Sequence, residues 1–146
     1  MKVKFLDGHE EVFGTLAGAD MEGAYQRGAS LRGANLRRAF LAGAFLPGAD
    51  LAGADLTGTS LAGADIEGAD LRGACLEGAN MRGAFLEGAD LRGANLAGAN
   101  IVDATLIGAD LRGANLAGAD IEGADLRGAD LRGTCLDKDT HLTQLA

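Results

Sequence analysis

The residues that could do chemistry in this chain are a few histidines and cysteines and many carboxylates. The 146-residue sequence holds 2 His, 2 Cys and 21 Asp or Glu. His9 and His141 stand near opposite ends with no Cys or His at ligand spacing, so the pattern of a zinc site is absent. The 24 glycines form neither a Walker loop nor a dinucleotide-binding fingerprint. The sequence therefore predicts no metal and no cofactor.

The carboxylates recur at a fixed spacing instead of gathering in one segment. The string Ala-Asp-Leu-Arg-Gly begins at 69, 89, 109, 124 and 129. A catalytic carboxylate pair needs a sheltered cleft that shifts its pKa values. Carboxylates placed by a repeat lie instead on the surface of the scaffold that repeats. We therefore predict that the protein has no catalytic residues.

The scaffold is a five-residue repeat. Every fifth residue from Leu16 to Leu136 is Leu, Ile or Met, except Gln26. Ala precedes each by two positions and Gly follows each by two positions, with few exceptions; Arg38 and Asp103 replace Gly. A helix would advance about 500° over five residues, so these side chains would not form a stripe. A short extended segment places Ala and Leu on one face.

The remaining two residues of each repeat predict a turn. Gly supplies the positive φ that the third residue of a type II turn requires. Pro47, the single proline, occupies the second turn position before Gly48. Copies of the repeat string at a spacing of 20 predict four sides per coil, hence about six coils and residues twenty apart stacked at about 4.8 Å. At Gln26 the sequence allows either a buried polar group with a partner or an irregular first coil, and we favour the irregular coil.

This pattern resembles the pentapeptide repeat family over nearly the whole chain, from about Gly14 to Lys138. The resemblance implies an all-β fold, a right-handed quadrilateral β-helix. Residues 1–13 are expected to form an N-terminal cap, 14–138 the β-helix and 139–146 a C-terminal tail. The cap would contain an extended segment with a tight turn, covering the coil end with Phe5 and Phe13. Leu142 and Leu145 would cap the other end or dock a second copy, giving a homodimer through a coil end.

The coil places outward residues in columns. One column holds Asp50, Asp70, Asp90, Asp110 and Asp130, and beside it run Arg32, Arg72, Arg92, Arg112 and Arg132, interrupted by Ala52. These columns could form a recognition stripe, but we favour a self-neutralised, solvated face, because exposed ion pairs contribute only about 0–1 kcal/mol each. Cys75 and Cys135 fall in one column three coils apart, roughly 14 Å, which predicts free thiols.

Two other sides gather four of the six aromatic residues at one corner. The candidate partner-binding residues there are Tyr25, Arg37, Arg38, Phe40, Phe45, Phe85, Val102 and Ile107. Exposed aromatics beside arginine are typical of interface hot spots. Scattered apolar residues are also common on surfaces, and Asp65, Glu67 and Glu87 interrupt this patch. We favour the interface.

Composition limits the classes of partner that the protein could bind. The net charge of −8 argues against direct nucleic-acid binding, and no apolar run is long enough to span a membrane. No signal sequence is present, so we expect a cytoplasmic protein. The leading hypothesis is a non-catalytic interaction or scaffold module with an unidentified protein partner. The family resemblance implies a rival, a DNA mimic that binds DNA gyrase or topoisomerase IV, both type II topoisomerases, and gives quinolone resistance. A third hypothesis is a near-consensus or designed repeat without a specific partner.

Overall fold

The computed structural model describes residues 2–4, 10–12 and 16–140. Strands β1 (Lys2–Lys4) and β2 (Glu10–Val12) pair antiparallel, with Val3 opposite Glu11. The expected extended structure within the first thirteen residues is thus present, whereas the expected tight turn falls on residues 5–9, which lie outside the described residues. The predicted covering and docking roles concern side chains that lie outside the described residues: Phe5, Phe13, Leu142 and Leu145.

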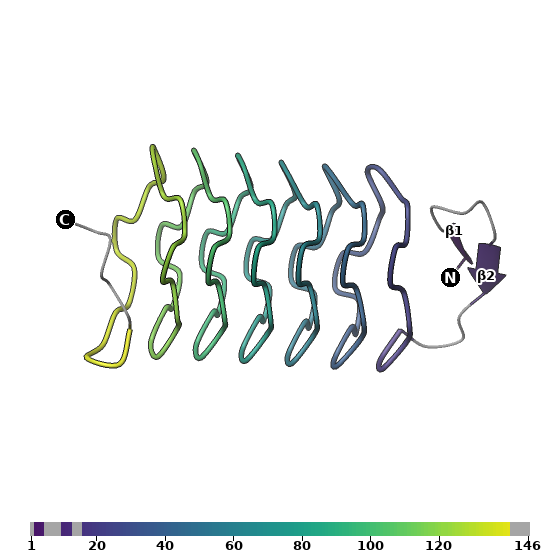
Figure 1. The fold of residues 1–146 in the computed structure, drawn as a ribbon, viewed down its shortest axis with the longest axis horizontal. Helices are drawn as coiled ribbons and strands as arrows, with labels where there is room; N and C mark the ends of the chain where they lie inside the picture. The colour runs from purple at the N-terminus through teal and green to yellow at the C-terminus, as the bar shows by residue number, and fades with distance from the viewer. Residues whose placement is uncertain (1, 5–9, 13–15, 141–146) are drawn as a thin grey trace.

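Between residues 16 and 140 the chain winds as a row of stacked coils (Figure 1). Isolated parallel bridges join residues twenty apart, beginning with Asp20 and Phe40. Asp70 is bridged to Asp90, and Asp90 to Asp110. The predicted stacking of residues twenty apart is therefore confirmed. Each side is extended over too few residues to form a longer strand, because a turn follows after every five.

The hydrogen bonds of one side explain why each residue type recurs. In the stretch from Asp70 to Ala74, the main-chain N–H groups of Asp70, Leu71 and Gly73 donate to carbonyl oxygens of the adjacent coils at 2.8–3.0 Å. The N–H of Ala74 donates to the Leu71 carbonyl at 3.0 Å and closes the turn. The N–H of Arg72 donates to the Asp70 carboxylate at 3.1 Å. Asp or Asn in the outward position thus supplies the acceptor that the backbone leaves missing.

The turns keep one geometry even where glycine is replaced. The turn glycines have φ between 62° and 70°, and Arg38 and Asp103 take φ values of 55° and 58°. Positive φ at the third turn residue alone is the type II pattern. The predicted turn type is confirmed.

The expected irregularity at Gln26 is wrong. Its N–H donates to the Phe45 carbonyl at 2.9 Å, and its carbonyl accepts from Ala29 at 3.2 Å, the same pattern as at Leu31 and Leu36. The Gln26 side chain is half-buried. A polar residue is accommodated there because the backbone bonds that define the coil do not involve the side chain.

The interior is filled by stacked Leu, Ile, Met and Ala side chains. Leu56, Leu71 and Leu86 have no solvent-exposed surface. Thr59 occupies one of the alanine positions, is fully buried, and donates its hydroxyl to the Leu36 carbonyl at 2.7 Å. No described side chain leaves a buried polar atom without a partner. The functional groups of the rod therefore lie on its outside.

Candidate functional site

One side of the rod carries a column of aromatic residues. Parallel bridges join Tyr25 to Phe45, Phe45 to Asp65 and Asp65 to Phe85, so these four residues follow one another along the axis. The rings of Tyr25 and Phe45 stack with their centroids 4.8 Å apart and their planes within 6°. Phe85, two coils beyond Phe45, is 45% exposed. Such stacking follows from the coil, because equivalent side chains lie one strand spacing apart.

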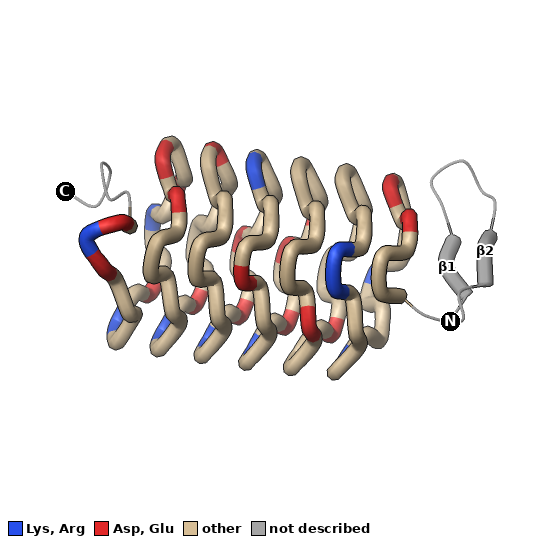
Figure 2. The backbone as a smooth tube through the Cα atoms, turned by 90° about the horizontal axis from the view of Figure 1, so that it is seen from below, with Lys and Arg blue, Asp and Glu red and all other residues tan. Residues whose placement is uncertain are grey.

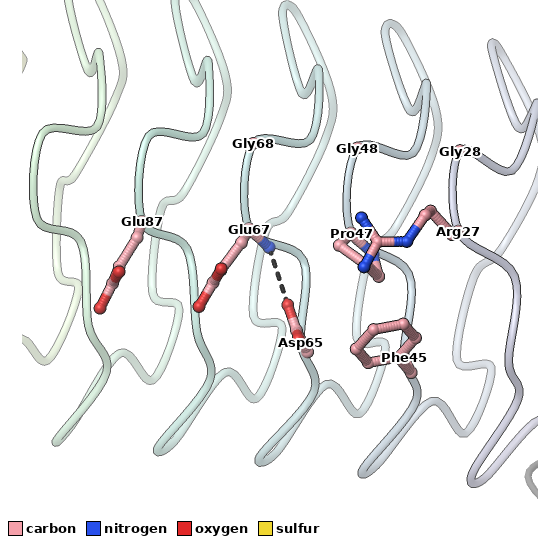
Figure 3. Close-up of a pocket in the computed structure, with 9 residues that line it drawn as sticks. All are labelled: Arg27, Gly28, Phe45, Pro47, Gly48, Asp65, Glu67, Gly68 and Glu87. Atoms are coloured by element: carbon pink, nitrogen blue, oxygen red, sulfur yellow. Dashed lines mark hydrogen bonds between the residues drawn. The ribbon is translucent and has the colours of Figure 1, made fainter.

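Arg27 and Pro47 frame the Phe45 ring. The Arg27 guanidinium carbon lies 5.6 Å from the ring centroid, within the range of a cation–π contact. Pro47 is buried and lies beside the ring (Figure 3). Phe45 cannot accept the N–H of the turn as Asp or Asn would, and proline has no N–H to donate. The Phe45–Pro47 pair therefore leaves no turn N–H without an acceptor.

A shallow depression of about 500 Å³ opens along this side. Its lining includes Arg27, Phe45, Asp65, Glu67 and Glu87 (Figure 3). Asp65 accepts the Glu67 N–H at 3.1 Å. The Glu67 and Glu87 side chains are exposed, lie one coil apart and point in the same direction. Within the described part of the chain, none of these three carboxylates makes a side-chain ion pair.

The structure places the other predicted partner-binding residues at several positions around the column of Tyr25, Phe45 and Phe85. Phe40, which is 50% exposed, lies on the preceding side, and Val102 and Ile107 are half-buried further along the rod. Arg37 lies on a different side and contacts the Asp55 carboxylate at 3.0 Å. Arg38 occupies a turn. The two arginines that the sequence suggested are thus separate from the column of Tyr25, Phe45 and Phe85.

Arg27 is the residue that the sequence argument missed. The signal was present, because Arg27 stands twenty residues before Pro47 and so in the same column. The depression that Phe45 lines is also lined by the three acidic residues that interrupt the aromatic patch in the sequence: Asp65, Glu67 and Glu87. The site is therefore both aromatic and acidic.

The Asp and Arg columns on the next side form a continuous ladder, whose arginines make the row of blue segments along the lower edge of Figure 2. The Arg72 guanidinium donates to Asp70 at 2.8 and 2.5 Å and lies 3.7 Å from Asp90 in the following coil. Arg92 and Arg112 repeat these contacts. Such paired charges make a neutral, solvated face, and this agrees with the hypothesis that we favoured for it.

The gap at Ala52 is spanned by an arginine from the coil before it. Arg32 donates to Asp50 at 2.9 Å and also lies 3.8 Å from Asp70. Ala52 itself is buried. The ladder is therefore continuous in charge although its arginine column is interrupted.

The arginines hold the ladder carboxylates in the ionised form. The hydrogen bond from Arg72 lowers the pKa of Asp70 to about 2, and partial burial opposes this shift. The hydrogen bond from Arg132 likewise lowers the pKa of Asp130 to about 2. The same contacts raise the pKa of the Arg72 guanidinium. Carboxylates with lowered pKa values are poor proton donors and acceptors near neutral pH.

The cysteines and remaining acids suggest no further chemistry. Cys75 and Cys135 are free thiols in one column, as predicted, and the Cys75 sulfur lies 3.2 Å from the Thr57 hydroxyl. Among the described residues, no group of three His, Cys, Asp or Glu side chains is arranged to hold a metal ion. No helix within those residues is long and apolar enough to cross a membrane.

Comparisons with known proteins give one consistent result. The family model for pentapeptide repeats matches eight copies, over residues 15–46, 36–73, 69–106 and 99–137. A pentapeptide repeat protein from the Arabidopsis thaliana thylakoid lumen is 28% identical, with a TM-score of 0.56 over 86% of this chain and 70% of that one. No curated protein gives a match.

Two other solved structures align with most of the chain. Rfr23 from the cyanobacterium Cyanothece 51142 is 28% identical, with a TM-score of 0.45 over 84% of this chain and 87% of that one. QnrB1, a plasmid-mediated fluoroquinolone resistance protein, is 24% identical, with a TM-score of 0.36 over 85% of this chain and 78% of that one.

Proposed function

Since the chain belongs to the pentapeptide repeat family, whose solved structures imply a right-handed β-helix, we propose that it is a non-catalytic rod that binds a protein partner. In this proposal the rod has four five-residue sides per coil and about six coils. Its interior is filled, and its exposed surface alone is available to a partner.

The proposal depends on the positions at which large apolar side chains are exposed. Among the described residues these are Tyr25, Phe40, Phe85 and Leu136. The three aromatic residues share two neighbouring sides, whereas Leu136 lies near the last coil. Exposed aromatic side chains at one place on an otherwise polar surface are typical of binding hot spots. The shallow depression beside them is open, which suits a protein surface better than an enclosed substrate.

Affinity capture with a matched pair of variants tests the proposal. The double variant Phe40→Ala and Phe85→Ala should lose at least one protein that the unchanged chain retains from a lysate, identified by mass spectrometry. The control is Arg112→Ala with Arg132→Ala, on the ladder side, which should retain it. Far-UV circular dichroism must be unchanged in both. Equal capture by all three proteins would remove the aromatic corner from consideration.

The rival function, mimicry of DNA toward a type II topoisomerase, rests on the acidic net charge of −8. The ladder does not favour it, because each of its aspartates lies beside an arginine. A supercoiling assay with DNA gyrase, with and without ciprofloxacin, separates the two functions. Inhibition of supercoiling that survives the Phe40→Ala and Phe85→Ala changes would favour the mimic.

A further inference from the structure

The aromatic column lies beside carboxylates that make no side-chain ion pair among the described residues, and this indicates what kind of group they would bind. Asp65 stands between Phe45 and Phe85 in one column. Glu67 and Glu87 line the depression beside them (Figure 3). Resting on the proposed protein-binding function, we propose that this depression receives the guanidinium group of an arginine in a basic segment of the partner protein.

The charge of the depression favours a cation. Three carboxylates, from Asp65, Glu67 and Glu87, line it with one guanidinium, from Arg27. The ladder on the next side has the opposite character, because its aspartates are held by neighbouring arginines. Glu87 also interacts with the charge of Arg127, a guanidinium that is hydrogen-bonded to Asp125. A cationic side chain would therefore find carboxylates without a side-chain ion pair in the depression and paired ones on the ladder.

The geometry favours arginine in particular. Glu67 and Glu87 are one coil apart, a spacing of about 4.8 Å between their main chains. A planar guanidinium has five N–H donors in a fork and can donate to two carboxylates while its face lies on an aromatic ring. Phe85 is exposed, follows Asp65 in the column and precedes Glu87 by two residues, and in the proposed complex its ring would offer such a face. The existing contact between Arg27 and Phe45 is an example of this stacking within the protein itself.

Other occupants fit less well. A purely apolar segment would cover Glu67 and Glu87 without giving them a partner, and burial of an unpaired charge is strongly unfavourable. An acidic segment would meet three carboxylates and only one arginine. The aromatic rings and the carboxylates are both used only when the incoming side chain is cationic and planar.

The probe is the peptide acetyl-Gly-Arg-Gly-Arg-Gly-amide, titrated into the full-length, nitrogen-15-labelled protein and followed by two-dimensional NMR. The amide signals of residues 65–68 and 85–88 should shift most. A peptide with Gln in place of Arg should produce no saturable shift. Equal shifts with the Gln peptide, or shifts spread evenly over all acidic columns, would overturn the proposal.

Matched charge variants separate the site from general attraction to an acidic protein. Glu67→Gln with Glu87→Gln should weaken the peptide at least fivefold. Glu77→Gln with Glu122→Gln, an equal change of charge on other sides, should alter the dissociation constant less than twofold. Arg27→Gln should strengthen binding, because it removes the one cation of the depression and uncovers Phe45. Equal weakening by both glutamate pairs, or weakening by Arg27→Gln, would reject the arginine site.

The two proposals can fail separately. If the peptide result is negative while Phe40→Ala with Phe85→Ala still abolishes partner capture, the corner binds a partner of another chemistry. If partner capture survives those two changes, the proposed function itself is wrong, whatever the peptide does.

Discussion

Replacement of the turn glycine Gly73 by alanine measures how strongly the coil depends on positive φ. Gly73 has a φ of 63°, and a Cβ added there would meet no atom within 4 Å. The loss should therefore come from the backbone alone. A left-handed conformation costs an L-residue about 1–2 kcal/mol. We expect Gly73→Ala to lower the free energy of unfolding by that amount, measured by urea denaturation followed by far-UV circular dichroism.

Gly123 is the matched comparison. Its φ of 70° is similar, but a Cβ there would overlap the Asp103 carboxylate. Because the Asp103 carboxylate is the end of an exposed side chain that can turn away, Gly123→Ala should lower the free energy of unfolding by only about 0.5 kcal/mol more than Gly73→Ala. Adding Asp103→Gly should recover that difference, a coupling that a double-mutant cycle measures. A loss below about 0.3 kcal/mol for Gly73→Ala, or equal losses at both glycines, would refute the reasoning.

Three other changes test the hydrogen bonds and charges outside the core. The pKa values of Asp70 and Asp130 fall from 3.8 to about 2 on folding, so their contribution to stability is present above pH 4 and is lost as the pH falls toward 2; urea midpoints measured across that range should decrease. Ala42→Pro should raise the free energy of unfolding by about 0.4–1 kcal/mol in thermal or urea unfolding, because no described group accepts the Ala42 N–H. Ala97→Pro should raise it less, because the Ala97 N–H donates to an asparagine side chain at 3.1 Å and that hydrogen bond would be lost. Phe85→Asn should stabilise by about 0.5–1 kcal/mol by supplying a turn acceptor, and should also reduce binding of the arginine peptide; unchanged stability would contradict the proposed role of Asp and Asn in the turns.

The repeat predicted the course of the backbone well, because the same residue types determine the backbone conformation in every five-residue side. Leu at one position, Ala two before it and Gly two after it determine which groups point inward and where the chain turns. The stacking of Asp70 on Asp90 followed from that spacing alone. Arg38 and Asp103 keep the turn because twenty-residue pairing on both sides of each turn holds its main chain in place.

The surface contacts could not be predicted in the same way, because the period fixes where a side chain starts but not its rotamer. Arg32 could have contacted only Asp50, yet it also lies within 3.8 Å of Asp70. Arg37, expected near the aromatic corner, contacts Asp55 instead. The placement of Arg27 over Phe45 depends on the side-chain torsions of both residues.

The hydrogen-bond pattern gives an independent reason to regard the aromatic column as functional. In most sides an outward Asp or Asn accepts the turn N–H, as Asp70 and Asn95 do. Phe and Tyr cannot accept that bond, so each outward aromatic residue lowers the stability of its own turn relative to Asp or Asn. Pro47 offsets this loss beside Phe45, but Phe85 is followed by Glu87, whose N–H has no acceptor among the described residues. Since Phe85 is also left exposed to water, neither the turn nor the core accounts for it, whereas a binding partner that covers its ring would.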